Sequence, residues 1–271
     1  MGSDLAENVR VKQQSPPDWD IRFRQQARWT ENLRQFIFSQ PEVKQTLAES
    51  PPLRVLETGC GTGAVTSSLY AILKENNADI HGLDIHRPFL QFGQQHQQAI
   101  QHTNGDVYRL PYANYSFDIT VCHFLLLWLA SPNEGLAEIC RVTRPGGWVV
   151  ALAEPDYGGR IDYPEALQKA GMLQAKSLQN QGADPNMGRK LSALFHHAGI
   201  ENIQTGVMGG QWNYRTIPQK DDTEWQTLTM DLETQIDEKE LERLKNIDRA
   251  AWQDGSRILF VPTFYAWGQT G

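Results

Sequence analysis

The sequence predicts an α/β fold built on a mostly parallel sheet with helices on both faces. Two observations indicate this. Short apolar runs alternate with segments of helical periodicity, and a glycine-rich bend, VLETGCGTG at 55–63, joins the first such run to the helix after it. Alternating strands and helices imply right-handed crossovers between parallel strands, which bury both faces of the sheet. With 271 residues the chain forms one large domain or two small ones.

The elements are justified in chain order by periodicity and by their end signals. Residues 1–50 read as a helical N-terminal segment, with apolar positions at 21, 29, 33, 36 and 37, and the prolines at 51–52 end it. We expect strands at 53–57, 79–85, within 116–127, and at 148–154, 201–212 and 257–268. We expect helices at 64–77, 88–100, 131–144, 188–200 and from 237 onward.

Local signals sharpen several of these boundaries. Ser131 and Pro132 suit an N-cap and a first helical position, with Glu134 completing a capping box, and Asp237 begins a second such box. Pro262 cannot donate to a sheet ladder, so its end of the last strand is placed near an edge. The segments 156–187 and 214–254 exceed a minimal α/β sandwich, and we expect them to form a helical cap over one end of the sheet.

Composition excludes several classes of protein. Apolar residues make up 40% of the chain, yet the longest apolar run, 124–130, is far shorter than the roughly 18 residues of a membrane helix. The N-terminus lacks the apolar core of a signal peptide, and three scattered cysteines suit a reducing compartment. A net charge of −7 argues against a nucleic-acid-binding face. The expectation is a cytoplasmic protein with no membrane span and no nucleic-acid partner.

The glycine bend lies where ligands bind in open parallel sheets, outside the carboxyl ends of the strands. A Walker-type phosphate loop is excluded because no Gly-Lys-Ser/Thr follows. The bend does satisfy a relaxed dinucleotide fingerprint, Gly59-x-Gly61-x-x-Ala64, with Asp84 about twenty residues on. Glu57 counts against that interpretation because its carboxylate would repel a pyrophosphate.

Three acidic residues indicate a different ligand. Glu57 precedes the bend and can face a cationic group, and Asp84 ends the second strand and can accept from a ribose diol. Asp106 follows what should be the third strand, ahead of a fourth within 116–127, and can accept from an adenine amine. The pattern fits an ammonium, a ribose and an adenine without phosphate. S-adenosyl-L-methionine has these parts.

Five motifs in order, VLETGCGTG, GLDI, GDVYRLPY, YSFDIT and RVTRPGGWVV, resemble those of class I S-adenosylmethionine-dependent methyltransferases, most of all the small-molecule branch with the ubiquinone and menaquinone methyltransferases. The resemblance is strong over about 50–155. It implies one methyltransferase domain over 1–271: a three-layer α/β/α Rossmann-like sandwich with a seven-stranded, mostly parallel sheet whose last strand is antiparallel. The N-terminal segment would be 1–50, the cofactor-binding core 51–155, and the cap insertions 156–187 and 214–254.

The resemblance also assigns site residues. Glu57, Gly59 and Gly61 would form the methionine-end loop, although relatives often have aspartate where Glu57 stands. Asp84 with Ile85 would bind the ribose side, and Gly105, Asp106 and Val107 the adenine. His123 follows the fourth strand, beside the sulfonium, and is a candidate proton acceptor. Arg28, on the N-terminal helix, would meet the methionine carboxylate.

The sequence therefore predicts transfer of a methyl group to O, N or C of a small, apolar or aromatic metabolite, with S-adenosyl-L-homocysteine as product. Two alternatives remain: a methyltransferase-fold protein that binds the cofactor without transferring methyl, and an NAD(P)-dependent oxidoreductase. No metal is expected, because the acids of EPDYGG at 154–159 lack a histidine or a third well-spaced partner. Trp128 is expected to pack against the cap. The acceptor's identity and the formation of a homodimer stay open.

Overall fold

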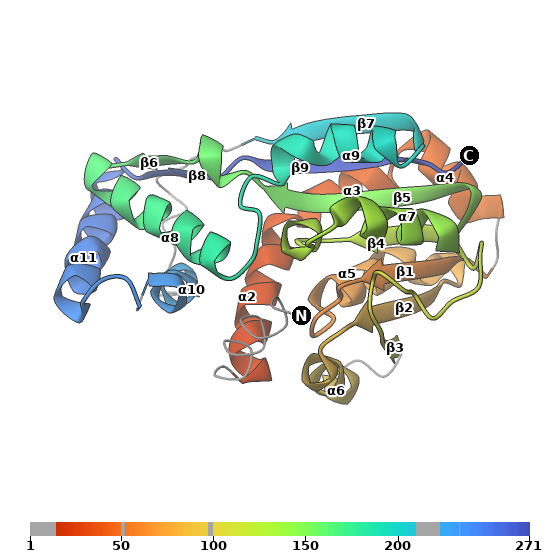
Figure 1. Ribbon diagram of the computed structural model, residues 1–271, viewed down its shortest axis with the longest axis horizontal. Helices are drawn as coiled ribbons and strands as arrows, with labels where there is room; N and C mark the ends of the chain where they lie inside the picture. The colour runs from red at the N-terminus through yellow and green to blue at the C-terminus, as the bar shows by residue number, and fades with distance from the viewer. Residues whose placement is uncertain (1–14, 50–51, 97–99, 210–222, 233) are drawn as a thin grey trace.

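Seven strands form one sheet in the order β3-β2-β1-β4-β5-β9-β7 (Figure 1). The computed structural model describes residues 15–49, 52–96, 100–209, 223–232 and 234–271. Pairing is parallel from β3 through β5, and β9 is antiparallel to both of its neighbours, β5 and β7. The predicted fold class and its antiparallel last strand are confirmed. The strands are β1 (Arg54–Thr58), β2 (Asp79–Asp84), β3 (Gln101–Asn104), β4 (Phe117–Cys122), β5 (Thr143–Pro155), β7 (Glu201–Met208) and β9 (Thr263–Gln269).

The sheet separates two apolar cores because successive strand residues face opposite sides. Along β5, Val149 and Ala151 belong to one core, whereas Val150 and Leu152 belong to the other. The first core is closed by α7 (Pro132–Val142) and α9 (Leu191–His197), and the second by α3 (Glu31–Phe38), α4 (Pro41–Glu49) and α5 (Ala64–Leu73). The central parallel strands β1, β2 and β4 and most of β5 are buried on both sides, as parallel strands under helices must be, whereas β3 and β7 at the edges are more exposed.

Two further helices pack at the end of the molecule where the carboxyl ends of the parallel strands lie. The N-terminal helix α2 (Pro16–Trp29) packs against α5 and α6 (Arg87–His96). The hydroxyl of Thr62, in the glycine bend, donates a 2.6 Å hydrogen bond to Asp20 of α2. The N-terminal helix is thereby held across the carboxyl ends of the parallel strands.

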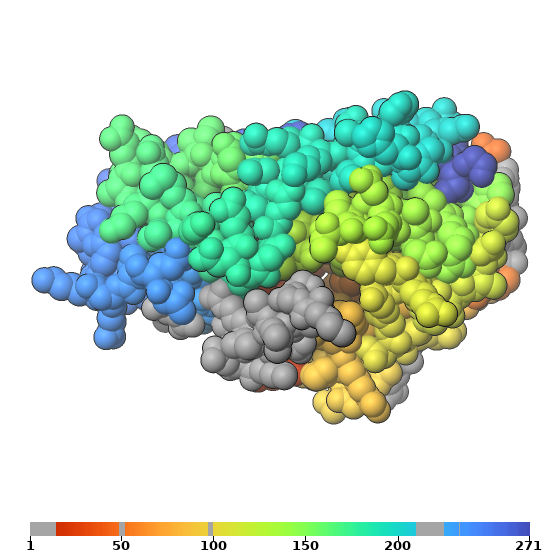
Figure 2. Space-filling model, viewed as in Figure 1, coloured from red at the N-terminus to blue at the C-terminus, as the bar shows by residue number. Residues whose placement is uncertain are grey.

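The cap lies beyond one end of the sheet (Figure 1). It contains α8 (Gln168–Asn180), α10 (Thr223–Leu232), α11 (Glu238–Asp254) and a two-stranded antiparallel sheet of β6 (Ile161–Tyr163) and β8 (Ile258–Phe260). In Figure 2 the green and blue segments of the cap make up one end of the elongated molecule. The cap has its own apolar core, made of Leu167, Ala170, Trp225, Leu228, Leu232, Leu241 and Leu244.

Several expected elements differ in detail. The single strand expected at 257–268 is two, because Pro262 separates β8, which pairs in the cap, from β9, which pairs in the main sheet. Ser131 caps α7 without a side-chain hydrogen bond; the Glu134 N–H donates instead to its backbone carbonyl at 3.0 Å. The Asp237 side chain does accept from the Glu240 N–H, at 2.7 Å. Parts of the expected elements, at 1–14, 50, 97–99, 210–212, 214–222 and 233, lie outside the described residues.

Candidate functional site

A cavity of about 500 Å³ opens at the carboxyl ends of β1, β2 and β4, under α2. It brings together all the predicted cofactor residues except Arg28. Two sets of side chains line it. The strand-end set is Glu57, Gly59, Cys60, Gly61, Leu83, Asp84, Ile85, Gly105, Asp106 and Val107. The second set comes from α2, from the loop after β4 and from the cap side, and includes Trp19, Arg22, Phe23, Gln26, His123, Phe124, Leu125, Leu127, Trp128 and Tyr157.

The glycine bend needs glycine at each of its three positions. Gly59, Gly61 and Gly63 have φ values of +70°, +54° and +85°, a region that side chains with a Cβ rarely adopt. The backbone N–H groups of Gly59 and Cys60 both donate to the carbonyl of Leu83, which ties the bend to β2. A Cβ on Gly61 would lie 2.8 Å from the Phe23 ring. The bend therefore presents bare backbone to the cavity.

Glu57 is buried at the end of β1, with 2% of its surface exposed. The Thr66 hydroxyl of α5 donates a short hydrogen bond to its carboxylate. Burial raises the pKa of Glu57 to about 8, against the opposing effects of the Thr66 hydrogen bond and the Arg34 charge. Near pH 7 the carboxyl group of Glu57 is therefore largely protonated, and a cation beside it would favour the ionised form.

Asp84 joins the bend to the end of β2. Its Oδ2 accepts from the Gly61 N–H at 2.8 Å and its Oδ1 from the His86 N–H at 2.7 Å. Carboxylate oxygens have more than one acceptor position each, so both can still accept from a hydroxyl in the cavity. Because Asp84 accepts from the Gly61 N–H, it occupies the donor that a pyrophosphate would use.

The adenine-side residues follow β3. Asp106 is exposed in a turn, where its Oδ1 accepts from the Tyr108 N–H at 2.9 Å. Gly105 is hydrogen-bonded through its N–H to the Asp84 carbonyl at 3.1 Å, which aligns the two strand ends. Val107 is buried, whereas Ile85 is 59% exposed beside the same cavity. These residues provide two apolar faces and a carboxylate acceptor around one space.

His123 lies in the cavity wall, in a polar cluster with α2 and α3. Its Nε2 is 3.0 Å from the hydroxyl of Thr30, and that hydroxyl accepts from the Arg34 guanidinium at 2.6 Å. Burial, followed by the Arg34 charge, lowers the pKa of His123 to about 3. The imidazole is therefore neutral near pH 7 and is a weak proton acceptor.

The structure does not bring Arg28 to the cavity. Arg28 and Trp29 are exposed, and neither lines the cavity. The cavity face of α2 instead carries Trp19, Arg22, Phe23 and Gln26. Their spacing of three, four and seven residues is a helical face, so this pattern was available as a sequence signal. Arg28 lies six residues beyond Arg22, and at 3.6 residues per turn it points away from that face.

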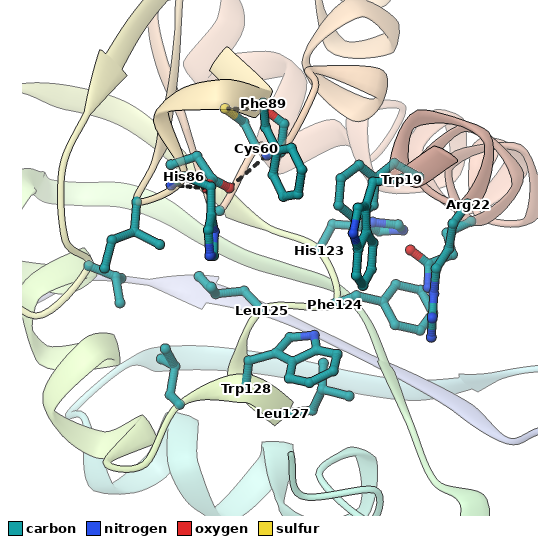
Figure 3. A pocket seen from close by; sticks show the side chains of 18 of the residues that line it. Trp19, Arg22, Cys60, His86, Phe89, His123, Phe124, Leu125, Leu127 and Trp128 are labelled. Carbon is teal, nitrogen blue, oxygen red and sulfur yellow. Dashed lines mark hydrogen bonds and ion pairs between the residues drawn. The ribbon is translucent and has the colours of Figure 1, made fainter. Parts of the chain in front are cut away.

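Aromatic rings dominate the second part of the cavity. Trp19 stacks on Phe23, with ring centroids 5.6 Å apart, and Phe23 meets Phe89 edge to face. Trp128, which was expected only to pack, is partly buried and lines the cavity, as does Tyr157. Figure 3 shows Trp19, Phe124 and Arg22 on one side of the pocket and His86 on the other.

The acids of EPDYGG have structural partners. Glu154 is fully buried and accepts from the backbone N–H groups of Leu125, Leu126 and Leu127 at 2.8–3.1 Å. It thus fixes the loop after β4 that lines the cavity. Asp156 pairs with Arg189 through two side-chain contacts. Among the described residues, no cluster of three or more His, Cys, Asp or Glu side chains is arranged to hold a metal.

Within the described ranges, no helix has both the length and the apolar character needed to cross a bilayer.

Comparisons with known proteins agree with this geometry. Residues 56–151 match the model of a family described as "Methyltransferase domain". The chain is 30% identical over 181 residues to the demethylmenaquinone methyltransferase of Lysinibacillus sphaericus, covering 60% of this chain and 76% of that protein. It is 36% identical over 123 residues to the demethylmenaquinone methyltransferase of Renibacterium salmoninarum, covering 44% and 50%. The chain therefore belongs to the family of S-adenosylmethionine-dependent methyltransferases.

The chain spans about half the length of several curated relatives; it covers 50% of the Renibacterium salmoninarum protein. Among solved structures it resembles a putative sarcosine dimethylglycine methyltransferase of Galdieria sulphuraria, with a TM-score of 0.54, 13% identity, and coverage of 88% of this chain and 86% of the other. At 13% identity this similarity shows the fold alone. Family and fold agree with what the five sequence motifs predicted.

Proposed function

We propose that this protein transfers a methyl group from S-adenosyl-L-methionine to an O, N or C atom of a small, apolar or aromatic metabolite. The observation that supports this most is a single cavity with two different halves. One half is lined by the strand-end acids and bare glycine backbone, and the other by aromatic and aliphatic side chains. Donor and acceptor would thus meet in one enclosed space.

The strand-end residues fit the cofactor part by part. Glu57 offers a carboxyl group that an ammonium would ionise, and Asp84 offers acceptors for a ribose diol. Asp106 would accept from the adenine amine, with Ile85 and Val107 on the faces of the ring and Gly105 beside it. Gly59 and Gly61 leave room for the methionine chain. We assign the cofactor site to these residues and withdraw Arg28, which is exposed.

When bound, the cofactor supplies a methyl group on an activated sulfonium leaving group. The protein's task is then to align the acceptor in line with that methyl and to exclude water. Orientation alone can lower such a barrier by about 7–11 kcal/mol. The loop held by Glu154 and the rings of Phe124 and Trp128 form the wall that would do this, and the ring faces would favour a cation. The cap, which supplies part of the cavity wall, would select the acceptor.

Two observations disfavour an NAD(P)-dependent reaction. Glu57 and Asp84 place two carboxyl groups at the glycine bend, and Asp84 already accepts the Gly61 N–H. A pyrophosphate at this position would meet the Asp84 carboxylate, which already accepts the Gly61 N–H, in place of a free N–H donor. The side chains of Glu57 and Asp84 are suited instead to binding a cation and hydroxyl groups.

Calorimetric titration tests the cofactor assignment. Wild-type protein and Asp84→Ala would be titrated with S-adenosylmethionine, S-adenosylhomocysteine and NAD, with Asp254→Ala, on the far helix α11, as the matched control. We expect adenosyl binding that Asp84→Ala weakens and Asp254→Ala does not. Heat from NAD alone would refute the proposal.

Cofactor turnover separates methyl transfer from binding without transfer. Protein incubated with methyl-labelled S-adenosylmethionine and a panel of phenols, amines and activated carbon acids should release S-adenosylhomocysteine with at least one of them. Tight cofactor binding without turnover across the panel would favour the scaffold alternative.

We also propose that the enzyme is cytoplasmic and has no nucleic-acid partner. The net charge of −7 supports the second part. Light scattering of the purified chain would decide between a monomer and a homodimer, and the absence of retention on heparin at low salt would support the lack of a nucleic-acid partner.

A further inference from the structure

Arg22 is a buried cation in the wall of the cavity. It lies on the cavity face of α2, and 7% of its surface is exposed. Its guanidinium lies 5.4 Å from the centroid of the Trp19 ring. Its ion-pair partner is Asp231 of the cap helix α10, with Nη1 and Oδ1 3.6 Å apart. That separation is too long for a hydrogen bond.

The N–H groups of Arg22 are therefore poorly satisfied. Among the described residues, none accepts a hydrogen bond from the Arg22 side chain, whereas Asp231 also receives a 3.0 Å hydrogen bond from Gln174. A guanidinium has several N–H donors in a fixed plane, and none of those of Arg22 is a fully buried atom without a partner, so they have access to the open space of the cavity. An oxygen acceptor on a ligand in the cavity could bind them there.

Arg22 also stands apart from the strand-end acids. Figure 3 shows it with Phe124 and Trp19 on the side of the pocket opposite His86, which follows Asp84. Its partner Asp231 belongs to the cap rather than to the glycine bend. Of the described residues that line the cavity, it is the one lysine or arginine. The half of the cavity that is lined by aromatic and aliphatic side chains, here called the acceptor half, thus combines an aromatic wall with the guanidinium of Arg22.

We propose that Arg22 binds a carboxylate on the methyl acceptor, so that the acceptor is an aromatic or apolar molecule with an acidic group at one end. This inference rests on the proposed function. A planar guanidinium matches a carboxylate with two parallel N–H donors, and the neighbouring Trp19 ring keeps it in that plane. The aromatic body would lie against Phe124 and Trp128, which places the nucleophilic atom toward the glycine bend.

The test compares two probes that differ only in charge: 2-naphthoate and 2-naphthamide. Each would be titrated calorimetrically into protein saturated with S-adenosylhomocysteine. We expect the wild type to bind the carboxylate about tenfold or more tighter than the amide, as a charge-assisted contact implies. In Arg22→Met, which keeps an apolar stem, the two affinities should agree within about twofold.

Two further variants make this result specific. Arg22→Met removes the ion pair between Arg22 and Asp231, so the double variant Arg22→Met/Asp231→Asn tests the same loss with the Asp231 charge removed as well. Arg28→Met removes an equal charge from the exposed face of the same helix. The carboxylate preference should be absent in the double variant and intact in Arg28→Met.

Other outcomes would overturn the inference. These are equal binding of the two probes to wild type, no binding of naphthoate at about 1 mM, or a preference that survives in Arg22→Met. A loss of S-adenosylhomocysteine affinity in Arg22→Met with the naphthoate preference unchanged would assign the cation to the cofactor's carboxylate. If S-adenosylhomocysteine does not bind wild type at all, the proposed function fails, and the probe comparison on the free protein still tests Arg22.

Discussion

The hydroxyl of Thr30 lies 3.0 Å from Nε2 of His123 and joins the N-terminal helices to the end of β4. The same hydroxyl accepts from Arg34, so a cation stands one hydrogen bond away from the imidazole. This contact links the cavity wall to the segment that covers it. Burial and, second to it, the charge of Arg34 favour the neutral state of the histidine in the folded protein.

We predict that His123 stays neutral over the physiological range. The folded-state pKa is about 3, below the ordinary 6.5, because of burial and Arg34. Between these values the unfolded chain binds a proton that the folded protein does not, so the free energy of unfolding falls as pH drops from 6.5 toward 3. In a proton NMR titration the His123 ring signals should not shift above about pH 5.

His123→Gln provides the comparison. This variant should lose less stability than wild type between pH 6.5 and 4, as measured by urea denaturation at each pH. A His123 titration near pH 6.5 in the wild type would contradict the prediction and restore the histidine as a candidate base.

The contribution of Glu57 to the free energy of unfolding should depend on pH in the opposite direction to that of His123. Its pKa of about 8 exceeds the ordinary 4.5, so the folded protein holds a proton that the unfolded chain has lost. The free energy of unfolding of the ligand-free protein therefore falls as pH rises from 4.5 to 8. Glu57→Gln should remove this slope and melt at a higher temperature than wild type at pH 8.5.

The same carboxyl group predicts proton release on cofactor binding. At pH 7 an arriving ammonium would ionise Glu57, so the heat of S-adenosylhomocysteine binding should differ between phosphate and Tris buffers. Glu57→Gln should abolish the difference and weaken binding by about tenfold to a hundredfold, as the loss of a charged hydrogen bond implies. Equal heats in the two buffers for wild type would show that Glu57 does not ionise on binding.

Glu154→Gln should loosen the loop after β4. The carboxylate accepts three backbone N–H groups, whereas an amide has one acceptor oxygen and would direct its own N–H groups at the others. We expect a loss of about 1–3 kcal/mol in the free energy of unfolding and weaker cofactor binding. Glu165→Gln, exposed in the cap, is the matched control. Unchanged urea midpoints for Glu154→Gln would argue against this role.

The strand-end half of the site was predictable because parallel strands share one geometry. Glu57 and Asp84 end strands whose positions are evident from apolar periodicity, whereas Asp106 follows β3, a short polar strand that periodicity alone does not reveal. All three lie at the edge where the carboxyl ends of the strands meet. Placing a residue at the end of such a strand does not require knowing which distant residues contact it. The glycine bend adds residues whose φ values only glycine adopts readily.

The acceptor half was less predictable because it depends on helix phase and on distant pairings. Arg28 and Arg22 share one helix, and choosing between them requires knowing which face of α2 meets the sheet. Arg22 pairs with Asp231, far away in the sequence. Glu154 is one of the acids of EPDYGG, and its partners are backbone N–H groups, which leave no mark in a sequence.

The last prediction concerns the closest approach between α2 and the glycine bend. A Cβ on Gly61 would meet the Phe23 ring at 2.8 Å, and Gly61 has φ of +54°. Gly199, at φ +72°, has open space around it, so Gly199→Ala isolates the backbone strain of about 1–2 kcal/mol. We expect Gly61→Ala to cost more than this in urea denaturation, because the ring must also move.

Only Gly61→Ala should weaken S-adenosylhomocysteine binding, since Gly199 follows α9 and does not line the cavity. Phe23→Leu in the Gly61→Ala background should recover part of the stability but not the affinity, because a smaller side chain relieves the contact while the added methyl still faces the ligand. Equal stability losses in Gly61→Ala and Gly199→Ala would mean that α2 shifts freely over the bend. In that case the helix would be a movable cover of the cavity rather than a fixed wall.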